Sequence, residues 1–110
     1  MKSFMLRTGQ ILLLACAAFF CLQASARADD AASLYKTKCA VCHGADGSGN
    51  TTMGKSLKMR DLGSADVQKQ TDAQLTEIIS NGKGAMPAYK TKLADAQIKS
   101  LVAYIRTLKK

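Results

Sequence analysis

Cys39, Cys42 and His43 are the residues of this chain whose types and spacing predict a specific chemistry. On a helix, side chains three and four positions apart lie on one face, so the two thiols and the imidazole are expected to point the same way. Two such thiols can add to the vinyl groups of a haem while the adjacent imidazole binds its iron. The run CAVCH therefore predicts covalent attachment of one haem c, with His43 on the iron.

Three other uses of these residues fit the sequence less well. A disulfide between Cys39 and Cys42 would close a very small loop and add little stability. A thioredoxin-like redox pair would need a βαβ unit, and no segment has the apolar–polar alternation of a strand. A closed zinc site needs four ligands, and the two cysteines and single histidine that follow residue 28 would need a carboxylate to complete it.

His43 is the single histidine of the chain, so a second protein ligand for the iron must be another residue type. A methionine, a lysine or an open position remains. Met86 differs from Met53 and Met59 because it stands in the run GKGAMP, where glycines permit a tight loop and Pro87 favours an extended backbone before it. Met86 is the strongest candidate, and Met59 is expected to contact the haem or fill the core.

Three helices are expected to position these residues in an all-α domain. Helical periodicity predicts the first over residues 30–42 and the last over residues 95–109. The second follows Thr71, which forms a capping-box signature with Gln74, and Gly82 can end it in the left-handed conformation.

The expected core comes from the apolar faces of these helices. The last helix places five apolar residues on one side, namely Ile98, Leu101, Val102, Ile105 and Leu108. Two glycine-bearing loops, residues 44–63 and 82–93, separate the helices, and the first has room for a short helical turn. A domain this small buries too little surface to be stable without a staple, so a bound group is expected to fill its middle.

Residues 1–28 have the layout of a secretory signal peptide. Lys2 and Arg7 precede an apolar run from Ile11 to Leu22, and small residues then allow cleavage after Ala26 or Ala28. The remaining domain, residues 29–110, is expected to be periplasmic. It keeps 13 basic and 8 acidic residues, a formal charge of +5.

Two anchored forms compete with a cleaved signal. Leu13–Cys16 resembles a lipid-attachment box, but six further apolar residues follow Cys16 and little apolar core precedes it. A transmembrane helix needs about 20 apolar residues, more than the run provides. No stable membrane insertion of the mature chain is expected.

Lysines are distributed over the loops and the first helix. Lys83, Lys90 and Lys92 flank the Met86 loop, where they could guide an acidic redox partner. The chain lacks the clustered basic residues with interleaved aromatics of a nucleic-acid interface, so nucleic acid is not an expected partner.

Three motifs together resemble the small bacterial and algal class I cytochromes c. They are CAVCHG with Gly47 and Gly49, then GKGAMPAY, and the last-helix pattern L-x-D-x-Q-I-x-x-L-V-A-Y-I-R-x-L. The resemblance covers nearly all of residues 31–108. It implies an all-α fold around one haem, first and last helices packed together, and His43 and Met86 as axial ligands.

Two positions depart from the family pattern. Ala94 stands where relatives often have the serine or threonine that caps the last helix, so Asp95 would have to cap it or the cap is missing. Arg60 stands where relatives often have proline.

The resemblance implies a one-electron carrier, which would cycle between Fe(III) and Fe(II). We expect the protein to be a monomer and not an enzyme, since two protein ligands on the iron suit a carrier. A haem peroxidase would need an open iron position with acid–base groups beside it. Two alternatives remain: a haem c subunit of a larger dehydrogenase or oxidase, and a redox or gas sensor in which Met86 leaves the iron on reduction.

Overall fold

A computed structural model describes residues 30–110, and the regular elements of this range are helices. The all-α fold expected from the sequence is confirmed. The predictions of a signal peptide and of a lipid box fall on residues 1–28, outside the described range. Besides helical residues 30–38, the elements are α2 (Ala40–His43), α3 (Thr52–Ser56), α4 (Ala65–Gln68), α5 (Asp72–Asn81) and α6 (Asp95–Thr107).

The first predicted helix is interrupted at the first cysteine. Residues 30–38 are helical, Cys39 forms a turn with φ −115° and ψ −36°, and α2 then adds one further turn. Gly44, with φ 84°, ends α2, and its N–H donates to the Ala40 carbonyl at 2.8 Å. The chemistry-bearing residues thus lie on a turn and a short helix, not in a continuous helix.

Helix α5 begins as the sequence predicts. The Gln74 N–H donates to Thr71 Oγ1 at 3.1 Å, and the Thr71 N–H donates to Gln74 Oε1 at 2.9 Å, which completes the capping box. Gly82 ends the helix with φ 75°, but its ψ of 170° is extended and not left-handed helical. The expected left-handed stop is therefore wrong, and the backbone leaves α5 directly into the Met86 loop.

Helix α6 ends at Thr107, two residues earlier than expected, and its cap differs from the prediction. Ala94 has no side-chain acceptor, and Asp95 does not cap the helix. Instead Gln97 Oε1 accepts from the Ala94 N–H at 2.9 Å, which is half of a capping box. The expected apolar face is present, with Leu108 half-buried and four residues buried: Ile98, Leu101, Val102 and Ile105.

Two short helices lie between α2 and α5 in the sequence. Helix α3 provides the helical turn that was expected in the first loop, and Thr51 caps it by accepting from the Gly54 N–H at 2.8 Å. Helix α4 was not expected. Ser64 caps it by accepting from the Val67 N–H at 3.4 Å, and Val67 belongs to the core.

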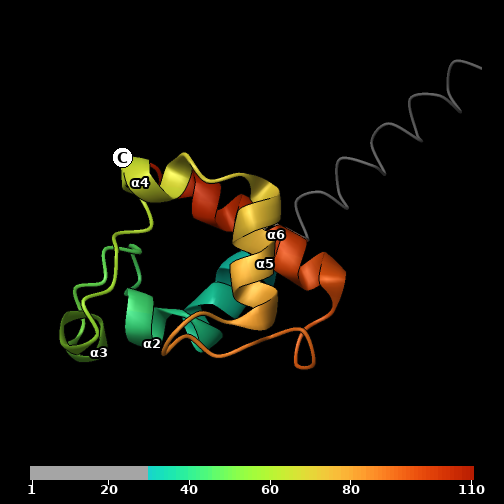
Figure 1. The fold of residues 1–110 in the computed structure, drawn as a ribbon, viewed down its shortest axis with the longest axis horizontal. Coiled ribbons are helices and arrows are strands. Elements are labelled where there is room, and N and C mark those ends of the chain that lie inside the picture. The colour runs from blue at the N-terminus through green and yellow to red at the C-terminus, as the bar shows by residue number, and fades with distance from the viewer. Residues whose placement is uncertain (1–29) are drawn as a thin grey trace, which may run out of the picture.

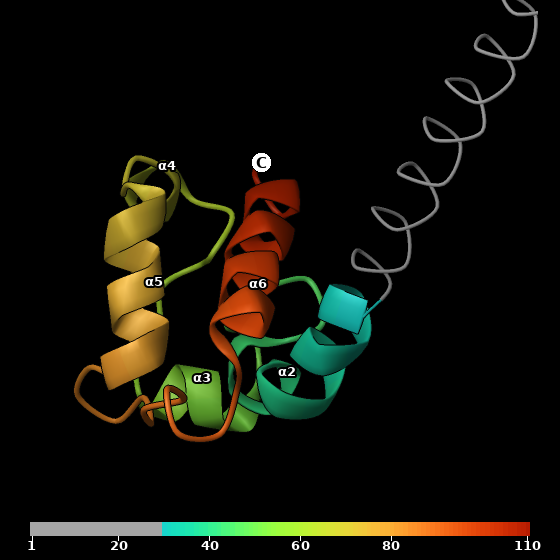
Figure 2. The same cartoon turned by 90° about the vertical axis from the view of Figure 1, so that its right-hand side faces the viewer.

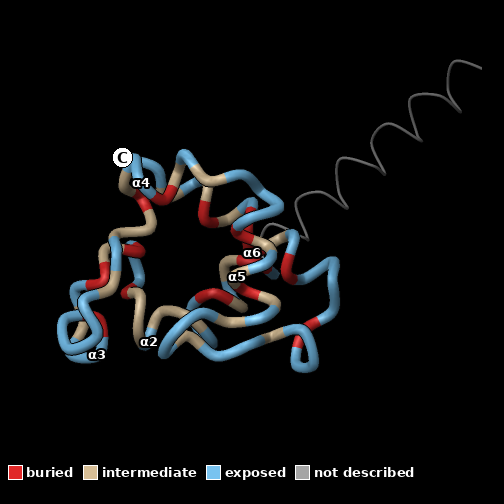
Figure 3. Tube along the Cα trace, in the orientation of Figure 1, coloured by how far each residue is buried: buried red, intermediate tan, exposed pale blue. Residues whose placement is uncertain are grey.

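Helices α5 and α6 run side by side in opposite directions (Figure 2). Toward the end where α5 stops and α6 starts lies α3, whereas α4 lies toward the other end (Figures 1 and 2). Helical residues 30–38 pack on α6, with the Tyr35 and Tyr104 ring centroids 4.9 Å apart, as expected for the first and last helices. Buried positions concentrate on α5, α6 and the glycine-bearing turns near α2 (Figure 3).

Arg106 joins α6 to the segment between α4 and α5. Its guanidinium donates to Asp72 Oδ1 and to the Gln68 carbonyl, both at 2.8 Å, and also to the Gln70 carbonyl. A planar guanidinium can satisfy several acceptors at once, so this single side chain fixes the segment that carries Gln70.

A bilayer crossing requires a long apolar helix, and no helix among residues 30–110 meets that requirement.

Candidate functional site

Cys39, Cys42 and His43, which are predicted to bind haem, lie at the turn formed by Cys39 and in the short helix α2 that follows it. The Cys39 N–H donates to the Tyr35 carbonyl at 2.8 Å, and the His43 N–H donates to the Cys39 carbonyl at 3.0 Å. These bonds hold Cys39 and His43 one turn apart on the wall of a cavity. Cys42 is half-buried and does not line that cavity, so the three side chains do not all meet on one wall as the sequence predicted.

Both cysteines are free thiols and do not form the disulfide considered from the sequence. Burial raises the pKa of the Cys39 thiol, and the neighbouring Cys42 raises it further. In the part of the chain that the structure describes, no three His, Cys, Asp or Glu side chains gather as a zinc site would require.

His43 presents a neutral imidazole to the cavity. Burial lowers its pKa, because an apolar environment disfavours the charged ring. Its Nδ1 is buried without a hydrogen-bond partner in the described residues. A half-buried imidazole with an unsatisfied buried nitrogen is suited to bind a metal, whereas a packed structural histidine normally has a partner.

The backbone around His43 is held by two hydroxyl groups that the sequence did not single out. Tyr35 Oη donates to the Gly44 carbonyl at 2.7 Å, and Thr51 Oγ1 donates to the Cys42 carbonyl at 2.6 Å. Helix α3 packs so closely that a Cβ on Gly54 would lie 2.1 Å from the Gly49 carbonyl oxygen. From the sequence, Thr51 could be recognised at most as a possible helix cap. Its hydrogen bond to the Cys42 carbonyl of α2 could not be predicted.

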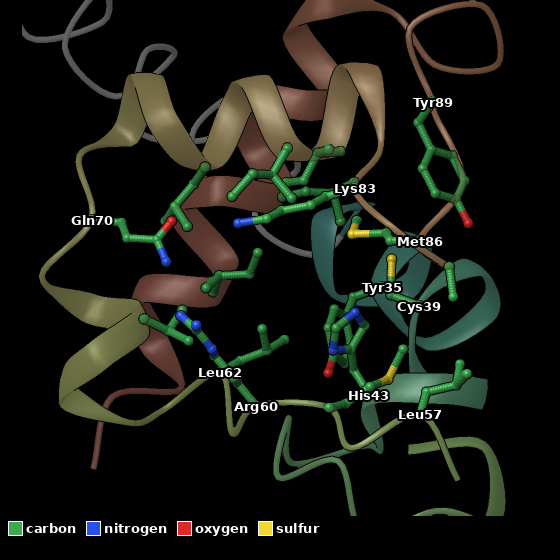
Figure 4. A pocket seen from close by; sticks show the side chains of 18 of the residues that line it. Tyr35, Cys39, His43, Leu57, Arg60, Leu62, Gln70, Lys83, Met86 and Tyr89 are labelled. Carbon is green, nitrogen blue, oxygen red and sulfur yellow. The ribbon is translucent and has the colours of Figure 1, made fainter. Parts of the chain in front are cut away.

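Met86 reaches the same cavity from the loop that follows α5. The loop closes through two backbone bonds, Lys83 N–H to the Met86 carbonyl at 3.2 Å and Met86 N–H to the Lys83 carbonyl at 3.0 Å. A Cβ at Gly82 would lie 2.6 Å from the Met86 carbonyl oxygen, so glycine is required there. Figure 4 shows Met86 and His43 entering the cavity from these two different elements.

The other two mature methionines differ in position. Met59 also lines the cavity and is half-buried. Met53 is 49% exposed and does not line it. The structure thus leaves Met86 and Met59 as the methionines within reach of a bound group.

The cavity has a volume of about 300 Å³ and lies between α2, α5, α6 and the Met86 loop. Its walls are mostly apolar. The apolar side chains that line it include Leu57, Leu62, Val67, Leu75, Ile78, Ile79, Leu93, Leu101 and Ile105.

These features fit a haem. An apolar cavity suits the porphyrin faces, and an imidazole whose buried Nδ1 has no partner within residues 30–110 suits the iron. A free thiol on the cavity wall at Cys39, with a second one three residues later at Cys42, suits the two vinyl groups. Polar side chains enter the cavity in one region, where Arg60, Gln70 and Lys83 are found (Figure 4). Arg60 was noted from the sequence only as a departure from the family pattern.

Comparison with known proteins gives a consistent result. Residues 26–105 match the family described as cytochrome C oxidase, cbb3-type, subunit III. The chain is 40% identical over 72 residues to cytochrome c6 of Leptolyngbya boryana, an alignment covering 66% of this chain and 81% of the relative. It is 35% identical over 103 residues to cytochrome c6 of Picosynechococcus, covering 86% and 87%.

One further relative is much longer than this chain. The cbb3-type cytochrome c oxidase subunit CcoP of Azospirillum brasilense is 35% identical over 86 residues, covering 76% of this chain but 29% of the subunit. Among solved structures, the KustC0563 c-type cytochrome superposes with a TM-score of 0.65 at 36% identity, covering 72% of this chain and 96% of that one.

Proposed function

The chain belongs to the small class I c-type cytochromes and carries one covalently bound haem c, and we propose that it is a periplasmic one-electron carrier rather than an enzyme. The observation that carries the proposal is the convergence of His43 and Met86, from α2 and from the 82–93 loop, on one apolar cavity. Two protein ligands would leave no position for a substrate on the iron.

Cys39 and Cys42 would hold the porphyrin through thioether bonds, and His43 and Met86 would hold the iron. Haem c supplies a one-electron Fe(III)/Fe(II) couple. A thioether ligand and an apolar wall both favour the reduced state, the first by its softness and the second by penalising the extra charge of Fe(III). Val41, between the two cysteines, is 68% exposed, so the thioether edge would lie close to the surface where electrons enter and leave.

A carrier should exist as a free protein. Export after cleavage near residue 26 or 28 would deliver the mature chain to the periplasm, where reduced cysteines can accept haem. We expect the protein purified at native abundance to elute as a monomer, with a mass of one mature chain plus one haem.

The match to the cbb3-type oxidase family favours one second candidate, a haem subunit held in a larger complex. Co-elution of the haem with oxidase or dehydrogenase subunits through two different separations would favour this candidate and contradict the free carrier.

We also propose that lysines near the Met86 loop guide an acidic partner. Lys92 Nζ lies 5.5 Å from the centroid of the Tyr89 ring, and Tyr89 lines the haem cavity, so Lys92 is close to the expected site of electron exchange. Lys83 is less suitable as a probe because it lines the cavity.

Lys92→Glu should therefore weaken the salt dependence of electron transfer to the partner. Exposed charges are screened over about 8–10 Å at physiological ionic strength, so the effect should appear in the association rate. The measurement is stopped-flow oxidation across a range of salt concentrations. Lys99→Glu on α6 makes the same charge change away from the cavity and is the matched control. Equal salt dependence in both variants would make Lys92 an ordinary surface lysine.

A further inference from the structure

We infer that Arg60 and Gln70, together with Lys83, bind the haem propionates and that Arg60 keeps them ionised. The inference rests on the haem c of the proposed function, but not on the axial methionine or on any redox partner. It assigns a role to Arg60, which the sequence marks only as a departure from the family pattern.

The three side chains come from separate segments and meet at one cavity. Arg60 follows α3, Gln70 lies between α4 and α5, and Lys83 follows α5. Figure 4 shows their polar ends on the side of the cavity away from Cys39. Gln70 is fixed there because its carbonyl accepts a hydrogen bond from Arg106.

Neither cation has an anionic partner among the described residues. The ion pairs of residues 30–110 are Lys69–Asp66, Arg106–Asp72 and Lys110–Asp61. Arg60 does contribute to the low pKa of Asp66, but hydrogen bonding and charge from Lys69 are the larger causes. No aspartate or glutamate lines the cavity; its other ionisable lining residues are Tyr35, Cys39, His43 and Tyr89.

The chemistry of haem identifies the ligand of this polar region. The vinyl groups and the propionates project from opposite halves of the porphyrin ring. With the vinyl carbons bound to the cysteines, the propionates must point away from Cys39, which is where the polar side chains lie. A guanidinium can bind a carboxylate through two parallel hydrogen bonds, and the Gln70 amide can donate further ones.

This contact has a defined electrostatic consequence. A neighbouring cation lowers the pKa of a carboxyl group, so Arg60 would keep the propionates ionised through neutral pH. An ionised propionate favours Fe(III), and the cation offsets that charge. Removing the cation should therefore lower the midpoint potential and move its pH-dependent step to higher pH.

The experiment is a titration of the midpoint potential of the purified holoprotein against pH, with NMR of the haem substituents reporting propionate ionisation directly. Arg60→Gln should show the lower potential and the upward shift of the propionate pKa, and Arg60→Lys should restore most of the wild-type curve. Lys55→Gln is the matched control: it removes one positive charge from exposed α3 at a residue that does not line the cavity.

Gln70→Glu provides a second test that does not remove Arg60. A carboxylate at this position should repel the propionates, and it should also lower the potential and raise their pKa. Superimposable titrations of Arg60→Gln and Lys55→Gln, or a wild-type titration for Gln70→Glu, would overturn the inference. The proposed function is tested separately, by the spectrum and the elution of the unaltered protein. If it failed, the titrations of the variants could still be interpreted.

Discussion

Met86→Ala should abolish the weak charge-transfer band between methionine sulfur and Fe(III), lower the midpoint potential, and let the reduced iron bind carbon monoxide. Removing the thioether takes away a ligand that favours Fe(II), which lowers the potential. It also opens a coordination position that an exogenous ligand can take. Optical spectroscopy, a redox titration and carbon monoxide binding measure the three effects separately.

Met59→Leu is the matched control for this variant. Met59 also lines the cavity, and leucine keeps nearly the same volume and apolar character, so only a ligand role would be lost. We expect the band and the potential to stay close to those of the wild type. If Met59→Leu lost the band while Met86→Ala kept it, the ligand assignment would be reversed.

The unaltered protein also tests the sensor alternative. A carrier with Met86 bound in both oxidation states should not bind carbon monoxide when reduced. Rapid binding by the unaltered reduced protein would mean that the methionine leaves the iron, and it would favour a gas or redox sensor.

The parts of the fold that depend on neighbouring residues could be predicted from the sequence. The capping box of Thr71 and Gln74 involves residues three apart, and the buried face of α6 follows from helical periodicity. Helix α4 was missed because it is a single turn, and one serine before a short polar segment is a weak signal. A long helix with a local cap signal could thus be predicted, whereas a helix of one turn could not.

The contacts that shape the site join residues far apart in the chain. Arg106 bonds to residues 34 and 38 positions before it, and no local pattern announces such a pairing. Gly82 was expected to be left-handed helical because glycine often is after a helix, but its ψ of 170° is extended. The Met86 carbonyl oxygen would lie 2.6 Å from a Cβ at Gly82, and no local pattern announces that close approach either. Likewise, nothing in the sequence indicates that Arg60 and Gln70 line the same cavity.

The double variant Cys39→Ala/Cys42→Ala, which cannot attach haem covalently, should lose most of its helical structure when haem is absent. The cavity lies among the residues that form the core, so an unfilled cavity removes contacts from both sides of that core. At roughly 24 cal/mol per Å³, a cavity of about 300 Å³ costs about 7 kcal/mol. The whole stability of a domain of this size is about 4–12 kcal/mol.

Circular dichroism and thermal melting of the haem-free double variant measure this loss. Val41→Ala is the control, since Val41 lies between the cysteines but is 68% exposed, and its truncation should change stability by less than about 0.5 kcal/mol. The wild-type haem should remain on the polypeptide after acid–acetone extraction, whereas haem added to the double variant should be extracted. The prediction would be contradicted by a haem-free double variant that keeps its helices and melts cooperatively. In that case α5, α6 and residues 30–38 would pack together without haem, and the fold would bind haem without needing it to form.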